Sequence, residues 1–221
     1  MSEKSLKEAN SPLLVGYALA HVLFLGWVLL GYPISASAIV SAGRVEWSKA
    51  GASLVVGLLV TLVNRLGGPE LKAQLVFWRY RHPYPGSRAF SELAGRDPRV
   101  DLDRLRDAVG GDLPKDPQKQ NREWYRLYQQ HADNPSVRSG HKEFLLFRDM
   151  AWLSVLLAVV GTVAVWIVAR SQASWWYGVA CIALYLGART GAAIAGRRFV
   201  CSVLACASSS AQLPSSVIMK P

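Results

Sequence analysis

The chain has 221 residues, of which 51% are hydrophobic and only 18% charged, and its formal net charge is +10. Long uncharged runs are typical of membrane helices and exclude an ordinary soluble core as the first interpretation. The three cysteines show no CxxC spacing, which excludes the common zinc and redox motifs, and we expect them to be small apolar helix residues.

A polar N-terminal tail over residues 1–12 precedes a first predicted hairpin over residues 13–66. Its first span, residues 13–32, is long enough to cross about 30 Å of hydrocarbon. Ala36-Ser37-Ala38 resembles a signal-peptide cleavage site, but the apolar run is longer than a usual signal-peptide core, which favours an uncleaved anchor. The second span is predicted over residues 50–66, and Gly67-Gly68 ends it.

Residues 67–149 are predicted to form a small helical domain between two hairpins. Three pairs, Asp97-Pro98, Asp116-Pro117 and Asn134-Pro135, each offer an N-cap side chain followed by a proline at the first helical position. The predicted helices cover about residues 69–81, 88–94, 99–109, 117–132 and 135–148. We expect the last to continue into the third span. No stretch alternates in the manner of a strand.

The second hairpin, residues 150–198, contains predicted spans over residues 150–169 and 174–196. Trp175-Trp176-Tyr177 form an aromatic belt where the fourth span begins. Residues 199–221 are predicted as a C-terminal tail with an apolar patch at 199–207. The sequence therefore predicts an all-α, polytopic membrane protein, with four transmembrane helices in two hairpins flanking a small helical cytoplasmic domain.

The distribution of basic residues predicts the orientation. Of the 25 Lys and Arg residues, all but Arg44, Lys49 and Arg170 lie on one side of the predicted spans. The positive-inside rule then places both termini and residues 67–149 in the cytoplasm of a bacterial cell, with the spans in its inner (plasma) membrane. Much of the excess positive charge lies at membrane edges, which suits anionic lipid headgroups and does not favour nucleic acid.

A ladder of small residues follows one stripe of the fourth span, at Ala183, Gly187, Gly191 and Ala195, and a parallel ladder occupies Ala188, Ala192 and Gly196. Spacing of four residues lets another helix backbone approach closely. We expect these residues to pack helices, and the chain to form a homo-oligomer. The partner helix belongs either to this chain or to a second copy.

Two ionisable residues interrupt the predicted spans. Arg189 either lines a polar path inside the hydrocarbon or extends to water at the cytoplasmic edge, and the sequence weighs these alternatives evenly. His21 lies in the middle of the first span. A neutral histidine hydrogen-bonded between helices is favoured there over a proton relay or gate.

Arginines interleaved with aromatic residues mark two stretches of the middle domain, residues 77–81 and 122–128. Most of their aromatic residues fit structural roles, as interfacial anchors or a core stripe. The candidates for binding an anionic small molecule are Arg79, Arg81, Arg122 and Arg126. His131, Asp133 and His141 match no metal-ligand spacing, and no phosphate loop, nucleophile elbow or dinucleotide fingerprint is present, so we expect no catalytic residue, metal or cofactor.

In span number and domain placement, the chain resembles the small four-span membrane proteins with a cytosolic domain found among bacterial phage-defence effectors; this resemblance covers topology and no specific motif. The helix expected to continue from residues 135–148 into the third span, together with the small-residue ladder and Arg189, favours a non-enzymatic effector or sensor, and the resemblance implies a role in antiviral defence. The cytoplasmic domain would receive a ligand or protein partner, and the spans would rearrange or open a pore. The alternatives are a membrane anchor or assembly subunit that recruits a soluble partner through residues 67–149, and a membrane-bound metal-dependent hydrolase.

Overall fold

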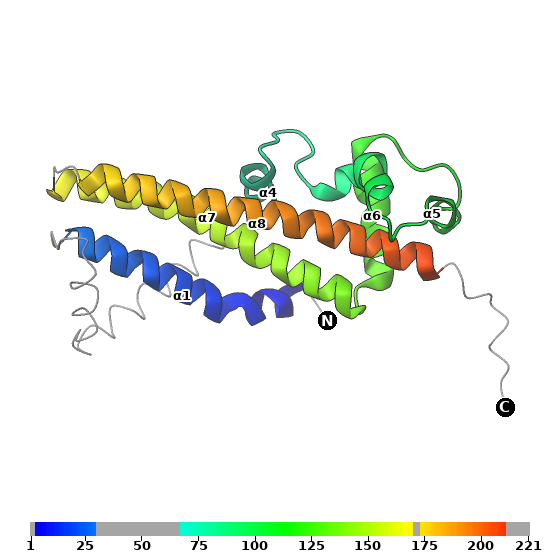
Figure 1. The fold of residues 1–221 in the computed structure, drawn as a ribbon, viewed down its shortest axis with the longest axis horizontal. Coiled ribbons are helices and arrows are strands. Elements are labelled where there is room, and N and C mark those ends of the chain that lie inside the picture. The colour runs from blue at the N-terminus through cyan, green and yellow to red at the C-terminus, as the bar shows by residue number, and fades with distance from the viewer. Residues whose placement is uncertain (1–2, 30–66, 170–172, 211–221) are drawn as a thin grey trace, which may run out of the picture.

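The computed structural model describes residues 3–29, 67–169 and 173–210, and every regular element within these ranges is a helix (Figure 1). The axis of the molecule is a long antiparallel pair, α7 (Pro135–Ala169) and α8 (Ala173–Ser210). The all-α prediction is confirmed for the described residues. The predicted second span at 50–66, residues 30–32 of the first span and the end of the chain from 211 lie outside them.

Helix α1 (Glu3–Leu29) packs along α7 and runs in the same direction. The Asn10 side-chain amide donates to the Lys142 carbonyl at 2.8 Å, and the Tyr17 and Ser154 hydroxyls lie 2.7 Å apart. Because the residue numbers rise together on both helices, the start of α1 lies beside the start of α7. Figure 1 shows α1 extending toward the same end of the molecule as the turn between α7 and α8.

Helix α7 is unbroken from the middle domain into the apolar hairpin, which confirms the predicted continuation at residue 149. Two stretches among the described residues, Pro135–Val163 and Trp175–Ser210, are long and apolar enough to cross a membrane by length and composition. The ends of α7 and α8 that lie away from the domain expose many large apolar side chains, including Trp166 at 67% and Trp175 at 79%. A soluble protein rarely exposes so large a continuous apolar surface. The length and apolar composition of these two helices give some support for association with a membrane.

The short helices around α8 correct several predicted boundaries. Helix α4 (Pro69–Phe77) ends at Phe77 and not near residue 81, because Trp78 adopts a left-handed conformation with φ of 52° and its N–H donates to the Gln74 carbonyl. Helix α5 (Leu102–Val109) begins three residues later than predicted, since Asp101 caps it. Asp97 binds Arg99 instead of capping a helix.

In place of the regular helix predicted at 88–94, the chain forms three successive short irregular helices, which we call the η turns: η3 (Pro85–Arg88) and η5 (Ala94–Arg96) are 3₁₀-helices, and η4 (Ala89–Leu93) is a π-helix. They rest on α6 (Pro117–His131), which begins at the predicted N-cap, Asp116. The buried Gln120 side chain on α6 accepts hydrogen bonds from the Phe90 and Ser91 backbone N–H groups. This side-chain anchor takes the place of regular helix hydrogen bonds there.

The core of the helical domain forms around the end of α8. Phe199, Val200, Val203 and Leu204 are buried among residues of the turns and of α5, α6 and α7. The prediction that residues 199–210 belong to a C-terminal tail is therefore wrong. These residues continue α8 and supply the apolar core of the domain. A chain whose domain core is built on α8 has a direct structural link from that domain to the hairpin.

Candidate functional site

The junction is the region where α4 meets α7 and α8, and we define it by Lys72, Trp78, Arg148, Asp149, Tyr185 and Arg189. It lies between the domain core and the apolar half of the hairpin. Gly191 packs on Phe147, so Arg189 of α8 and Asp149 of α7 lie at similar heights along the hairpin. The junction therefore gathers charged residues at the level where the exposed surface of the hairpin becomes apolar.

A buried ion-pair network joins α4 to α7. Lys72 Nζ lies 3.0 Å from Asp149 Oδ1, and Arg148 donates to the same oxygen from Nε and Nη2 at 3.2 and 3.1 Å. The Lys72 and Asp149 side chains are each only 5% exposed. Buried charges are stable only when paired, so this network fixes α4 against α7 at one position.

The residue before the N-cap of α4, Gly67, packs closely against Lys72 of the ion-pair network and against Trp152. A Cβ atom on Gly67 would lie 2.6 Å from Trp152 Cε2 and 2.9 Å from Lys72 Cε. Only glycine lets the backbone approach these two side chains, which explains why the chain enters α4 through Gly67-Gly68-Pro69. Pro69 occupies the first position of the helix, where its missing N–H costs nothing.

A second contact joins the other end of α4 to α8. Trp78 Nε1 donates to the Tyr185 hydroxyl at 2.9 Å, and that hydroxyl donates to the Leu75 carbonyl at 2.8 Å. The Arg189 guanidinium stacks on the Trp78 ring, with its Cζ 3.8 Å from the ring centroid. Such cation–π contacts contribute about 0.5–1 kcal/mol when exposed and about 2 when desolvated. We call these three side chains, Trp78, Tyr185 and Arg189, the latch.

The latch shows which part of the fold surrounds Arg189, the residue that interrupts the predicted fourth span. Its guanidinium meets Trp78 of α4 at the height of Asp149, and its buried Nε has no hydrogen-bond partner among the described residues. The arginine thus lies where the domain contacts the hairpin, about four helical turns along α8 from the exposed Trp175. Sequence patterns flagged Arg189 and Trp78 separately, but their pairing depends on the early end of α4.

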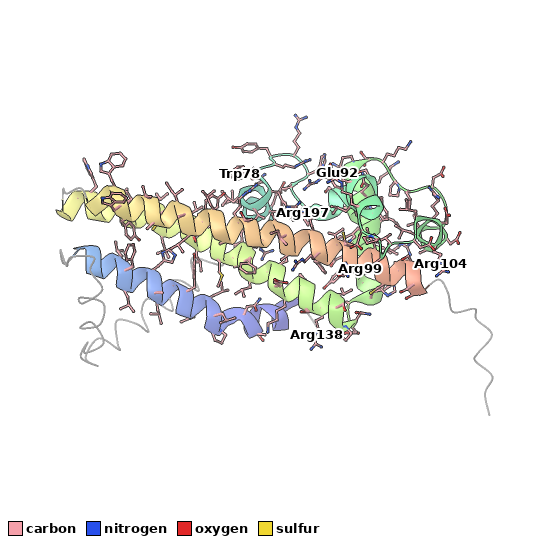
Figure 2. All side chains as sticks on the ribbon, in the orientation of Figure 1. Trp78, Glu92, Arg99, Arg104, Arg138 and Arg197 are labelled. Atoms are coloured by element: carbon pink, nitrogen blue, oxygen red, sulfur yellow. The ribbon has the colours of Figure 1, made fainter. Side chains whose placement is uncertain are left out.

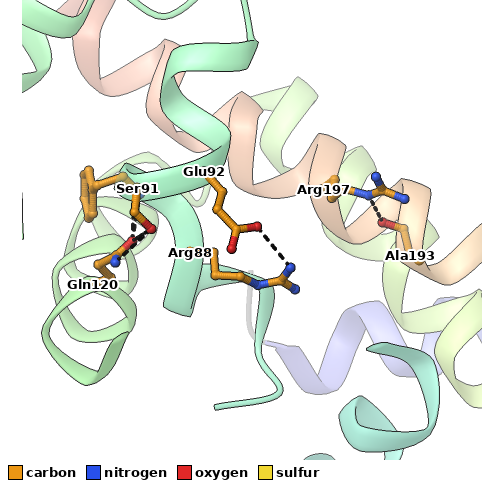
Figure 3. A network of polar contacts seen from close by, with 7 residues as sticks. Arg88, Ser91, Glu92, Gln120, Ala193 and Arg197 are labelled. Atoms are coloured by element: carbon orange, nitrogen blue, oxygen red, sulfur yellow. Dashed lines mark hydrogen bonds and ion pairs between the residues drawn. The ribbon is translucent and has the colours of Figure 1, made fainter. Parts of the chain in front are cut away.

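Two arginines lie beside the latch, where α4 and the η elements contact α8, and Figure 2 shows one of them, Arg197, near Trp78. Arg88 Nη1 donates to Glu92 at 3.3 Å, and its Cζ lies 5.8 Å from the centroid of the Phe77 ring. Arg197 Nε donates to the Ala193 carbonyl at 3.1 Å on the facing part of α8 (Figure 3). Neither arginine is singled out by the sequence patterns; the Arg197-Arg198 pair after the fourth span was the available signal.

The four arginines predicted as ligand contacts do not form one group. Arg79 and Arg81 are exposed just after α4, and Arg122 is exposed on α6. Arg126 forms an ion pair with Glu123 and donates to the Ala108 carbonyl at 3.0 Å, which ties α6 to the end of α5. The positive charge of Arg79 lowers the pKa of Arg88 beside the latch, whereas Arg126 has a structural role.

The predicted packing ladder divides into two halves. A Cβ atom on Gly191 would lie 2.9 Å from Phe147 of α7, and Ala195 is buried. The parallel ladder packs in the same way, with Gly196 between Phe144 and Phe77. Ala183 and Gly187 are exposed, and a Cβ on Gly187 would meet no described atom within 4 Å. The half of the ladder formed by Gly191 and Ala195 therefore packs within the chain.

The histidines occupy three different surroundings. His21 is 3% exposed, lies edge-on to Tyr17 at 4.8 Å, and neither of its ring nitrogens has a hydrogen-bond partner among the described residues. His141 stacks on Phe199 at 4.6 Å, and its Nδ1 lies 3.0 Å from the Tyr128 hydroxyl. His131 ends α6.

The hydrolase alternative needs a cluster of metal ligands. Within residues 3–29, 67–169 and 173–210, no three His, Cys, Asp or Glu side chains come together as a metal site would require. Comparison of the chain with protein-family models, with curated proteins and with solved structures finds no match. The geometry of the junction is therefore the basis on which a function can be assigned.

Proposed function

We propose that the chain is a non-enzymatic membrane effector or sensor, whose helical domain receives a ligand or partner and transmits the event to the membrane helices. One observation carries the proposal: α7 and α8 run unbroken from the core of the domain to the exposed apolar hairpin. A change of packing in the domain acts on the same two rigid helices that continue into the hairpin.

Membrane insertion is supported by the described helices and by the charge pattern. α1 carries no charged residue from Leu13 to Leu29 and runs parallel to α7, so its start lies on the side of the domain. Gly67 lies beside Trp152 near the domain, so the chain between Leu29 and Gly67 connects the far end of α1 to the junction. A four-span protein with both termini in the cytoplasm of a bacterial inner membrane has this connectivity.

Coupling through the junction follows from its two contacts. The ion-pair network holds α4 on α7, and the latch holds α4 on α8. Helix α4 therefore bridges the two long helices at the base of the hairpin. A shift of α4 would alter the position of α7 relative to α8, and small helix displacements of this kind occur in allosteric transitions. In the proposed role the spans rearrange, or open a pore as a homo-oligomer.

A docking role is the second candidate, favoured by exposed aromatic side chains on the domain. Tyr80 is 89% exposed and Tyr125 is 51% exposed. Aromatic residues of this kind are enriched at protein–protein contacts. An anchor or assembly subunit would use them to recruit a soluble partner without any movement of the hairpin.

Membrane potential, measured with a voltage-sensitive dye in induced bacterial cells, tests the effector role. We expect the wild type to dissipate the potential and Arg189→Leu to preserve it, with Arg104→Leu on α5 as the control that also removes one positive charge. If Trp78→Leu matches Arg189→Leu, the latch carries the effect; if only Arg189→Leu preserves the potential, Arg189 contributes to the conducting path. A full potential in cells with abundant, inserted wild type, together with a stoichiometric soluble partner lost in Tyr80→Ala Tyr125→Ala, would instead establish the docking role.

A further inference from the structure

Three arginines from separate parts of the chain lie around Phe77, beside the latch. Arg88 ends η3 and its Cζ lies 5.8 Å from the centroid of the Phe77 ring, and Arg79 follows Phe77 by two residues. Arg197 follows Gly196 on α8, where a Cβ atom would lie 3.0 Å from Phe77 Cζ. Figure 3 shows Arg88 and Arg197 on neighbouring elements, with their guanidinium groups directed at Glu92 and at the Ala193 carbonyl. Arg88 is half-buried, and its buried Nε atom has no hydrogen-bond partner among the described residues. We call these three residues the arginine cluster.

The charges of the cluster are not balanced by the acidic residue beside it. Burial and then the nearby positive charge of Arg79 lower the pKa of Arg88, and Arg197 acts in the same direction. Glu92 opposes them through its charge and a 3.3 Å hydrogen bond, which is long for a charge-assisted contact. Glu92 is the carboxylate that Arg88 contacts, and the positive charges of Arg79 and Arg197 act against it at Arg88.

From this convergence we propose that the arginine cluster binds a phosphate group. Guanidinium groups present planar, paired N–H donors that match phosphate oxygens, and they lose less hydration energy than ammonium groups do when they bind. An anion bound by Arg88 and Arg197 would supply the acceptor that Arg88 Nε lacks and would reduce the repulsion that Arg88 experiences from Arg79 and Arg197. The phosphate can come from a lipid headgroup or from a soluble ligand, because both present the same oxygens.

The position of the cluster links this site to the proposed coupling function, on which this part of the inference rests. Arg88 lies over Phe77, the last residue of α4, and the next residue is Trp78 of the latch. Phe77 in turn lies against Gly196 and Phe144. Drawing Arg88 toward Arg197 would therefore act on the end of α4 at the point where it meets α8.

The experiment uses the full chain in nanodiscs and follows thermal unfolding by tryptophan fluorescence. In the first arm, inorganic pyrophosphate is titrated into discs of phosphatidylcholine; in the second, these discs are compared with discs that also contain phosphatidylglycerol. The variants are Arg88→Gln and Arg197→Gln. Arg104→Gln is the matched control, since Arg104 lies on α5, pairs with Asp101 and carries the same charge. Arg197 is exposed, so its variant tests the site even if Arg88→Gln fails to fold.

We expect the unfolding temperature to rise in at least one arm, and the cluster variants to weaken this response about tenfold or more while the control keeps it. A response to pyrophosphate identifies a soluble phosphate ligand, and a response confined to phosphatidylglycerol identifies a lipid headgroup. Absence of both responses in the wild type, or an equal loss in Arg104→Gln, overturns the site. Phosphate binding without any effect on membrane potential refutes the effector role alone, whereas dissipation of the potential without phosphate binding refutes the site alone.

Discussion

At the scale of single residues, the buried carboxylate of Asp149 has the largest structural consequence in the junction. It is the acceptor for Lys72 and for Arg148, and all three side chains are nearly inaccessible. We expect Asp149→Asn to lower the free energy of unfolding by about 3–5 kcal/mol, because it leaves buried cations without their counter-charge. Denaturant-induced unfolding in detergent micelles, followed by tryptophan fluorescence, measures this.

The control for that variant is Asp103→Asn. Asp103 pairs with Arg106 on the surface of α5, and its side chain is 91% exposed. Exposed pairs of this kind contribute less than about 1 kcal/mol, so the control should unfold almost as the wild type does. Equal losses in the two variants would show that burial of Asp149 has no special role in holding α4 on α7.

A second prediction at this scale concerns Asp97. Hydrogen bonds from Arg99 lower the pKa of the Asp97 carboxyl from 3.8 to about 2. A carboxyl with a lowered pKa adds stability that is fully present above pH 4 or so and is lost as the pH falls through about 2. The stability difference between wild type and Asp97→Asn should therefore shrink from pH 5 to pH 2. A difference that stays constant over this range, measured by unfolding at each pH, would contradict the assignment.

At the scale of elements, α8 presents two kinds of small residue. Gly196 fits between Phe77 and Phe144, whereas the site of a Cβ on Gly187 is open within the chain. Gly196→Leu should lower the free energy of unfolding by about 1–3 kcal/mol through overpacking. Gly187→Leu, the same change two and a half turns away, should stay within about 1 kcal/mol of the wild type or gain stability from helix propensity. Unfolding of both variants in detergent tests this.

The same pair of variants reports on assembly. If a second copy packs against the exposed half of the ladder, Gly187→Leu reduces the oligomer fraction in light scattering while leaving the fold stable. An unchanged oligomeric state together with unchanged stability would mean that Gly187 contacts no second copy. A loss of stability in Gly187→Leu equal to that in Gly196→Leu would contradict the division of the ladder.

Local chemistry predicted some elements well and others not at all. Asp116-Pro117 and Asn134-Pro135 begin helices where expected, because the caps are formed by neighbouring residues: Asp116 accepts from the Lys119 N–H and Asn134 from the Ser136 N–H. The end of α4 could not be predicted, because Trp78, whose backbone is in the left-handed region, is bound by Tyr185, more than a hundred residues away. The η turns likewise depend on Gln120 of another element.

At the scale of the whole molecule, the candidate site could be predicted only in fragments. Arg79 stood out because it lies among aromatic residues, and Arg189 because it interrupts an apolar run. Arg88 has no distinguishing neighbour and Arg197 stood out only as part of a basic pair; they join the site because α8 runs on, unbroken, into the domain core. The apolar composition of residues 199–207 fits either a C-terminal tail or a core helix, and only their tertiary contacts show that they form a core helix.

Orientation is a property of the entire chain, and cysteine labelling tests it. In a background with Cys181, Cys201 and Cys206 replaced by alanine, single cysteines would be introduced at Glu8, Tyr125 and Trp175, all exposed in the structure. The parallel packing of α1 on α7 puts Glu8 and Tyr125 near the same end of the hairpin and Trp175 at the other.

We expect a membrane-impermeant maleimide to react with the cysteine at 175 in intact spheroplasts, and with those at 8 and 125 only after lysis, because the basic residues keep the domain and both termini in the cytoplasm. Labelling at 8 but not at 125 in intact spheroplasts would contradict the parallel arrangement of α1 and α7. Labelling at 8 and 125 but not at 175 would reverse the orientation and leave the packing intact. Because α7 and α8 are continuous from one labelled end to the other, each outcome assigns a side of the membrane to the junction as well.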